Sequence, residues 1–174
     1  MKKIIIIVIC IIAVIAAGAP LFRMYTKMAS PEATAQISVK DLKMTVYYSQ
    51  PSKKGRDIFG NVVPYSKIWR TGANEATEIE ISRDVTIGGK PLKAGRYALF
   101  SIPEKDKWTI VFNTELGMWG HFSYDEAKDA LRIDVTPTES SDSIEKLTIS
   151  FKEAETGADM VLAWDKTVVS VPIR

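Results

Sequence analysis

The chain has 174 residues, of which 23 are lysine or arginine and 21 are aspartate or glutamate, with one histidine and one cysteine. Lys2 and Lys3 account for the basic excess, so the remainder is neutral and lacks the surplus positive charge that usually marks nucleic-acid-binding proteins. Cys10 lies in an N-terminal apolar run, which excludes disulfides and thiolate metal sites from the rest of the chain. The usual zinc sites need several nitrogen or sulfur ligands, and the chain has one histidine, His121. We expect neither a metal nor a cofactor.

The first predicted element is an uncharged segment of 19 residues, Ile4 to Phe22. As a helix it would be about 28 Å long, at about 1.5 Å per residue, which nearly matches the roughly 30 Å hydrocarbon core of a bilayer. The sequence therefore favours a membrane anchor within residues 1–28, which include a short linker, and contact with the membrane through residues 4–22. The alternative is a cleaved signal peptide, with a small-residue site at residues 14–16. Either way we predict an extracytoplasmic protein, periplasmic or at the cell surface.

Residues 29–174 have the length of a single domain with one core. Two early strand patterns in this domain are separated by a long segment, Ser52 to Asn74, which is too long for a hairpin and too apolar for a flexible linker. Long loops inside compact domains are often functional. The segment runs into the unusual sequence "IWRTGANEAT", Ile68 to Thr77, which makes this stretch the first candidate for a site.

Beyond the long segment, apolar and polar residues alternate along most of the chain. The clearest examples are "TEIEIS" at 77–82, "WTIVFN" at 108–113, "LRIDV" at 131–135 and "KLTISF" at 146–151. Half-buried antiparallel strands produce this period of two, because successive side chains point to opposite faces of the sheet. We therefore predict an all-β antiparallel sandwich of roughly eight to eleven strands over residues 29–174.

Shorter signals refine this prediction. Gly88-Gly89, between two short apolar runs, predicts a two-residue hairpin. Residues 124–131 could form one helical turn at most. The serine-rich stretch near Ser141 predicts a surface turn, and residues 160–174 are expected to form two strands on either side of Asp165-Lys166.

Several stretches carry a family resemblance. They are "YSQPSKKGRDIFGNVVPYSKIWRTGANEAT", "VTIGGKPLKAGRYALFSIP", "WTIVFN" and "WGHFSYDEAKDALRIDVTP". Together they resemble an exported bacterial family of unknown function that is common in Bacteroidetes-type bacteria, over nearly all of the chain from about Ser30 onward. The resemblance implies an exported, mainly β domain, often behind a cleaved signal. It implies no reaction and no catalytic residues.

Residues in and near the long segment could form a binding site. Arg70 offers a planar fork for a carboxylate or phosphate. Asn74 and Glu75 add hydrogen-bonding groups suited to a sugar or peptide, and aromatic rings add stacking faces. The leading functional hypothesis is a non-catalytic binding or interaction module in the cell envelope, for a carbohydrate, a peptide or a protein partner. The candidate residues are Arg56, Tyr65, Trp69, Arg70, Asn74, Glu75, Trp119 and Tyr124.

The same residues also have a structural interpretation, which the sequence favours for the "WRTGANE" stretch. Trp69 would anchor in the core, and Arg70 would pair with a carboxylate or cap backbone carbonyls. Gly72 would supply a positive φ. Asn74 would hydrogen-bond within its own turn, and Glu75 would pair with Arg70 or a neighbouring lysine.

Two alternative functions stay open. A hydrolase of envelope carbohydrate or peptide could use Glu75, Glu78 or Glu80, because Glu78 and Glu80 share one strand face at a spacing that glycoside hydrolysis allows. Such pairs occur on most exposed strand faces, so the sequence leans away from an enzyme. A purely structural envelope protein is the third hypothesis, and it predicts that Arg70 and Glu75 are buried and satisfy each other.

Overall fold

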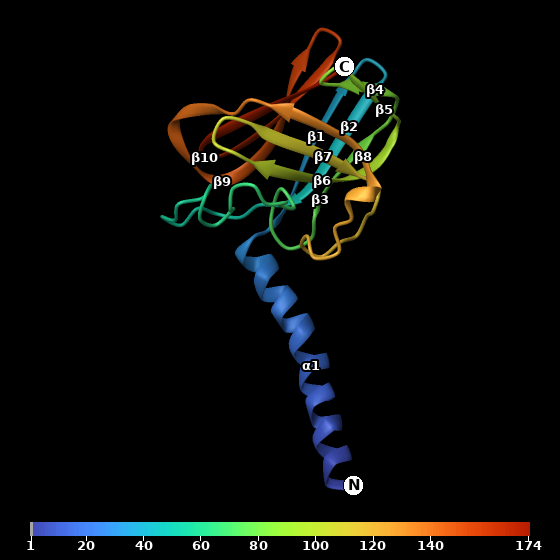
Figure 1. Cartoon of the computed structure of the whole chain (residues 1–174), viewed down its shortest axis with the longest axis vertical. Coiled ribbons are helices and arrows are strands. Elements are labelled where there is room, and N and C mark those ends of the chain that lie inside the picture. The colour runs from blue at the N-terminus through green and yellow to red at the C-terminus, as the bar shows by residue number, and fades with distance from the viewer. Residues whose placement is uncertain (1) are drawn as a thin grey trace.

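A computed structural model describes the backbone of residues 2–174 and the side chains of residues 3, 4, 7 and 18–174 (Figure 1). Helix α1 (Lys2–Ala29) projects from one end of a β domain. Among the described side chains, no helix has an apolar stretch long enough to cross a membrane. The predicted anchor at residues 4–22 falls largely on residues 5, 6 and 8–17, whose side chains lie outside the described set, so it stays a prediction.

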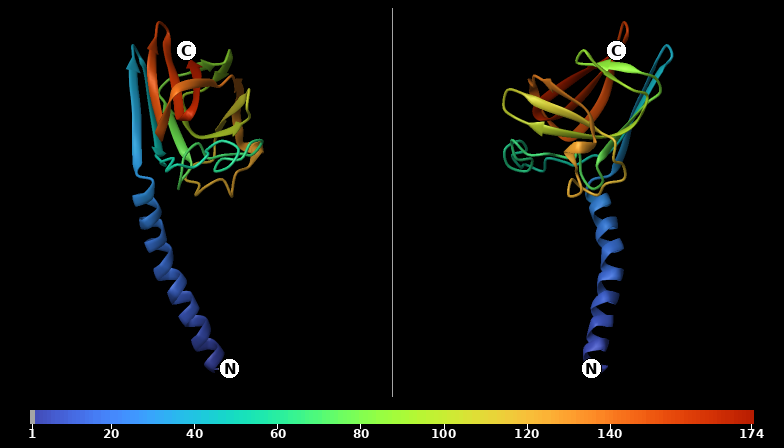
Figure 2. Two further views of the ribbon diagram at one scale, coloured as in Figure 1. Left: turned by 90° about the vertical axis from the view of Figure 1, so that its left-hand side faces the viewer. Right: turned by 45° about the vertical axis from the view of Figure 1, so that its right-hand side comes forward.

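The β domain is built from two antiparallel sheets, which confirms the predicted sandwich (Figure 2). The strands of the six-stranded sheet, in spatial order, are β1 (Glu32–Val39), β2 (Leu42–Ser49), β3 (Thr77–Ile81), β6 (Gly95–Pro103), β7 (Trp108–Asn113) and β8 (Asp129–Val135). Those of the four-stranded sheet are β5 (Lys90–Leu92), β4 (Val85–Ile87), β10 (Gly157–Ile173) and β9 (Thr138–Ala154). The inner faces of both sheets contribute to one large core.

The local predictions hold where the pattern is strong. In β3, Ile79 and Ile81 are buried while Glu80 is exposed, as period two requires. The hairpin at Gly88-Gly89 joins β4 to β5, and the predicted helical turn is the short 3₁₀ helix η1 (Glu126–Lys128). Local sequence patterns are therefore sufficient to predict these elements.

Two predictions near the C-terminus are wrong. The segment after Met160 belongs to one continuous strand, β10, and Ser141 lies within β9 instead of in a turn. The two long strands pair with each other from Gly157↔Ala154 to Val168↔Thr138, with irregularities on both sides of Asp165. Pairing with a partner strand satisfies the backbone hydrogen bonds even where the side chains are polar. A bulge places an extra residue in one strand of a pair without ending that strand.

The long segment between β2 and β3 closes the end of the sandwich near α1. Ile58 and Val63 are buried, and the Phe59 ring packs edge-on against Trp108 at 4.9 Å between ring centroids. The same ring contacts Trp69 and Trp164 at 6.1 and 6.2 Å. Aromatic pairs in this range stabilise the folded state beyond the effect of burial alone. The segment is therefore an ordered, packed part of the domain and not a flexible linker.

A smaller cluster covers the outer face of the six-stranded sheet. Ala98 and Phe100 of β6 and Val111 of β7 are buried there beneath Ala76 and Met118. The segments 68–76 and 114–125 therefore cross this face at the end of the domain from which α1 leaves (Figure 2).

Candidate anion-binding site

The stretch from Trp69 to Thr77 is pinned to β6 at its start. Trp69 N donates to Ser101 O at 2.8 Å, and Ser101 N donates to Trp69 O at 2.9 Å. The indole Nε1 of Trp69 donates to Gly72 O at 3.1 Å, and its ring stacks on Trp164 with centroids 6.1 Å apart. Trp69 is therefore a core anchor, as the structural interpretation predicts.

The backbone after Trp69 is strained. The predicted positive φ at Gly72 is wrong, because the left-handed residues are Thr71, with φ of 51°, and Asn74, with φ of 57°. Gly72 is required for space instead, since a Cβ there would lie 2.9 Å from Thr77 Oγ1 and 3.2 Å from Ser49 O. A β-branched residue such as Thr71 at positive φ typically costs about 1–3 kcal/mol, and such strain is concentrated at functional sites.

Asn74 and Glu75 hold helix α1 and not a turn of their own. Asn74 Nδ2 lies 3.4 Å from Thr26 O and 3.2 Å from Ser30 O, so it satisfies carbonyls at the helix end. Glu75 Oε1 lies 3.1 Å from Lys27 Nζ, and this contact, after the larger effect of Glu32, raises the pKa of Lys27. Glu75 therefore pairs with a neighbouring lysine, one of the two predicted partners.

Trp119 completes the contact with the helix. The Arg23 guanidinium carbon lies 4.8 Å from the centre of the Trp119 ring, within the range of a cation–π interaction. The predicted residues Asn74, Glu75 and Trp119 thus belong together, and what they bind is the end of α1.

Arg70 lacks the partner that both structural predictions gave it. In the described part of the chain its buried Nε has no hydrogen-bond partner. None of the ion pairs among the described residues involves its guanidinium. Burial lowers the pKa of Arg70 below its usual value, because desolvation penalises the charged form. The guanidinium lies close to the backbone of Gly120, where an added Cβ would come within 3.7 Å of Arg70 Nη1.

His121 lies opposite Arg70, and the sequence did not single it out as a site residue. Gly120 N donates to Asn74 O at 2.9 Å, and Gly120 has a φ of 74°, so a tight turn brings His121 toward the strained stretch. Its buried Nδ1 has no hydrogen-bond partner among the described residues. Burial, and then the charge of Arg70, lower the pKa of His121, while its ring stacks on Phe122. The available signal was the Gly-His pair inside an aromatic loop.

A cavity of about 450 Å³ brings these groups together. Its basic lining residues are Arg56, Lys67 and Arg70, its histidine is His121, and none of the described aspartates or glutamates lines it. Arg56 also caps its own turn, since its Nε donates to Lys53 O and its Nη2 to Ser52 O. The other lining residues are Ser30, Pro51, Val62, Val63, Pro64, Ile68, Trp69, Gly72, Ala73 and Trp164.

A family model described as a protein of unknown function, DUF2911, matches residues 30–173. This protein belongs to the DUF2911 family. The match covers both sheets of the DUF2911 domain and the whole lining of the cavity, and it confirms the resemblance noted in the sequence. No curated protein and no solved structure matches the chain.

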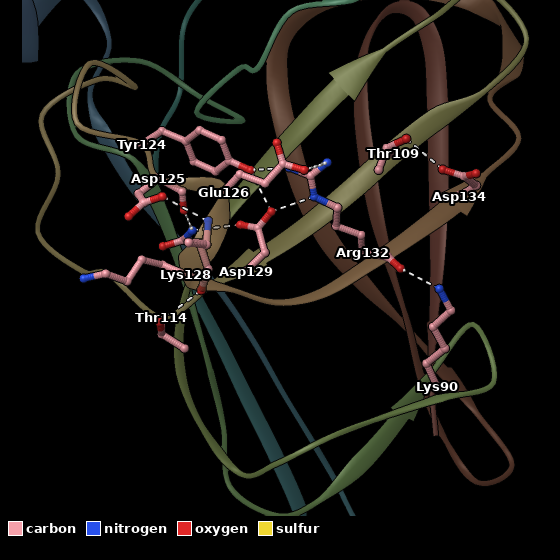
Figure 3. A network of polar contacts seen from close by, with 12 residues as sticks. Lys90, Thr109, Thr114, Tyr124, Asp125, Glu126, Lys128, Asp129, Arg132 and Asp134 are labelled. Atoms are coloured by element: carbon pink, nitrogen blue, oxygen red, sulfur yellow. Dashed lines mark hydrogen bonds and ion pairs between the residues drawn. The ribbon is translucent and has the colours of Figure 1, made fainter.

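Tyr124, also a predicted site residue, is part of a separate network of the DUF2911 domain (Figure 3). Its hydroxyl donates to Asp129 Oδ2 at 2.7 Å and accepts from Arg132 Nη2 at 2.6 Å. Its ring packs on Phe100 with centroids 5.0 Å apart, and burial is the main cause that raises the pKa of Tyr124 to about 12. Tyr124 does not line the cavity beside Arg70. Its contacts are those of a structural residue.

Tyr65 lies away from the Arg70 cavity as well. Its ring fills the space over Gly60, where a Cβ would come within 2.8 Å of Tyr65 Cε2. It borders a smaller depression, of about 290 Å³, together with Phe59, Trp108 and Lys166. Of the eight predicted residues, the structure brings Arg56, Trp69 and Arg70 to one cavity and distributes the others over different contacts.

The hydrolase alternative would use Glu75, Glu78 or Glu80. In the DUF2911 domain two of these carboxylates form ion pairs and the third is exposed. Glu78 Oε2 lies 2.7 Å from Arg96 Nε, and Glu78 Oε1 accepts from Gly117 N at 2.8 Å. Glu75 pairs with Lys27, and Glu80 is exposed on β3. A carboxyl that transfers a proton must be free to approach the substrate, and no contact of these three glutamates favours that role.

Proposed function

We propose that this protein is a non-catalytic binding module of the cell envelope, and that its ligand is a small anion with an apolar body. The observation that carries the proposal is the buried Nε of Arg70, which has no partner among the described residues and borders a cavity without acidic lining. The strained φ of Thr71, next in the chain, supports a role beyond folding.

The Arg70 side chain is half-buried, and its fully buried, unpaired Nε is energetically unfavourable. Even after relaxation, the desolvation of an ion costs several kcal/mol, and proteins normally offset this with a partner of opposite charge. Arg70 has none in the described part of the chain, and Arg56 and Lys67, which share its cavity, add to the positive potential instead of neutralising it. An anion supplies the missing partner, because a carboxylate or phosphate accepts two parallel hydrogen bonds from one guanidinium.

The remaining walls of the cavity favour a ligand with an apolar part. Trp69 Nε1 is committed to Gly72 O, and Trp164 Nε1 lies 3.3 Å from Glu145 O, so the indoles offer only ring surface. Val63 and Ile68 add aliphatic surface. A volume of about 450 Å³ lies within the range of about 300–1,000 Å³ that small-molecule sites occupy. A hydrocarbon acid or a sugar acid fits this lining better than an inorganic ion.

The single histidine of the chain provides a direct test. The imidazole NMR signals of the full chain in detergent micelles are recorded during titration with hexanoate, glucuronate and inorganic phosphate, with glucose as a neutral control. We expect the organic anions to shift the His121 signals at lower concentration than phosphate and glucose to leave them unchanged. Arg70→Gln should weaken the binding at least about tenfold, since a buried charge-assisted contact is worth about 2–5 kcal/mol.

A matched variant separates the site from general charge effects. Arg83→Gln removes an arginine whose buried Nε also lacks a hydrogen-bond partner but lies 3.2 Å from Asp41 Oδ1 on the β1–β2 turn, outside the cavity. It should leave the titration unchanged. If none of the anions shifts the His121 signals, or if Arg70→Gln and Arg83→Gln behave alike, the binding function is wrong.

We propose further that the domain is held outside the cytoplasm by an anchor at residues 4–22. The support is the uncharged run of 19 residues, whose length as a helix nearly matches a bilayer core. Flotation of the full chain with vesicles through a density gradient, after washing at alkaline pH, tests the anchor. Recovery in the soluble fraction would show that the segment does not hold the protein in lipid.

A further inference from the structure

The geometry points to a membrane-contact surface, formed by Val62, Leu116, Trp119 and Phe122, that rests on the lipid headgroups of the bilayer into which α1 inserts. This inference goes beyond the binding cavity and rests on the proposed anchor. It assigns a partner, the headgroup layer, to three exposed apolar side chains and to the partly exposed Trp119.

Arg23 gives the height of this surface along the helix. It is the first residue after the apolar run that ends at Phe22, so it lies at the boundary between hydrocarbon and headgroups if the run spans the bilayer. Its guanidinium carbon lies 4.8 Å from the Trp119 ring. Trp119 is therefore at the same level, and tryptophan is enriched at this level in membrane proteins because its ring is apolar and its N–H is polar.

The orientation of the domain on the helix is fixed by polar contacts beyond Arg23. Asn74 Nδ2 reaches Thr26 O and Ser30 O, and Glu75 pairs with Lys27, so one short segment grips the last turns of α1 on the side of Trp119. A flexible tether would let the domain tumble away from the bilayer. Because these contacts fix the domain on the helix, the loops beside the helix stay oriented toward the bilayer.

The loops at this end expose apolar side chains. The described large hydrophobic residues of the β domain that are exposed include Phe122, with 81% of its surface accessible, Leu116 with 42% and Val62 with 39%. All three lie in the loops 50–76 and 114–125, at the end from which α1 leaves (Figure 2). Exposed apolar groups at one end of a domain are candidates for an interaction surface. Because the proposed anchor leaves the domain at the same end, lipid is the partner that we infer.

Fluorescence quenching locates the surface, because three of the four tryptophans are buried. Trp69, Trp108 and Trp164 have 8%, 3% and 2% of their surface accessible, whereas Trp119 is partly exposed. The full chain is reconstituted into vesicles of phosphatidylethanolamine and phosphatidylglycerol in which part of the lipid carries bromine near the headgroup or deeper in the acyl chain. We expect bromines near the headgroup to quench the fluorescence more than bromines deeper in the acyl chain. The fluorescence lost should equal the emission of one tryptophan, and Trp119→Phe should abolish the quenching.

A second pair of variants moves the probe. In the Trp119→Phe background, Phe122→Trp should restore quenching, while Glu155→Trp, on the β9–β10 turn beside Lys40 at the far end of the domain, should not. Protein that floats with the vesicles but shows no quenching, either of native Trp119 or in the Phe122→Trp variant, would overturn the contact surface and leave the anchor standing. Protein that does not float removes the anchor and the surface together, while the His121 titration in micelles still decides the cavity.

Discussion

Two arginines of this domain have opposite surroundings. Arg132 Nε lies 2.6 Å from Asp129 Oδ2, its Nη1 lies 3.0 Å from Glu126 Oε1, and its Nη2 donates to the Tyr124 hydroxyl (Figure 3). Arg70 is half-buried, and its buried Nε has no partner in the described part of the chain. Satisfied charges belong to the architecture, whereas the unpaired Nε of Arg70 is the basis of the proposed anion site.

The largest loss of unfolding free energy is expected when Arg132 loses its carboxylate partner. Asp129→Ala removes the carboxylate that accepts from Arg132, Tyr124 and Asn113. Breaking a buried ion pair typically costs about 3–5 kcal/mol, and because a third of the Arg132 side chain is exposed we expect about 2–3 kcal/mol less free energy of unfolding in urea.

Asp134→Ala is the control for this measurement. Asp134 pairs with Lys107 at 3.3 Å, but more than half of each side chain is exposed, so the loss should stay below about 1 kcal/mol. Equal losses in the two variants would mean that the network around Arg132 is not structural, and the contrast with Arg70 would disappear.

A smaller effect of opposite sign is expected at Arg70. Arg70→Met keeps much of the volume of the side chain and removes its charge, so the folded state no longer bears an uncompensated desolvation cost. We expect the free energy of unfolding in the absence of ligand to stay unchanged or to rise by up to about 1 kcal/mol, while anion binding is lost. A decrease of about 2 kcal/mol or more would show that Arg70 stabilises the fold through a partner.

The smallest effect concerns pH and His121. Because burial and Arg70 lower the pKa of His121 in the folded protein, the unfolded chain binds more protons below about pH 6.5. His121 therefore destabilises the folded state as the pH falls through the pKa that its imidazole has in the unfolded chain. At higher pH this effect is absent. Urea unfolding of wild type and His121→Gln should differ more at about pH 5 than at about pH 7.5, with wild type losing more stability on acidification.

The ligand state sharpens the same comparison. A bound anion favours the charged imidazole, so saturation with hexanoate should raise the pKa of His121, measured by NMR, whereas Arg132 and its network should be unaffected. A His121 pKa that is the same with and without the anion would separate His121 from the binding site.

Much of the fold could be predicted from the sequence because the signals are local. Alternation in "TEIEIS" predicts a strand with Ile79 and Ile81 inward, and two glycines predict the β4–β5 turn, since pleat and turn chemistry depend on neighbouring residues. The C-terminal pattern is ambiguous by comparison, because a bulge at Asp165 in one long strand and a turn between two strands carry the same polar residues.

The sequence by itself determined the strands with clear alternation, favoured a core position for Trp69 and showed a polar stretch beside it. Only the tertiary structure decided what each polar side chain meets: Asn74 reaches Thr26, 48 residues away, Glu75 takes Lys27 and leaves Arg70 unpaired within the described chain, and the turn at Gly120 brings His121 to the Arg70 cavity. Periodicity reports which face of a strand is buried. Which charges satisfy one another depends on contacts between distant segments, and those exist only once the two sheets, their loops and α1 have packed together.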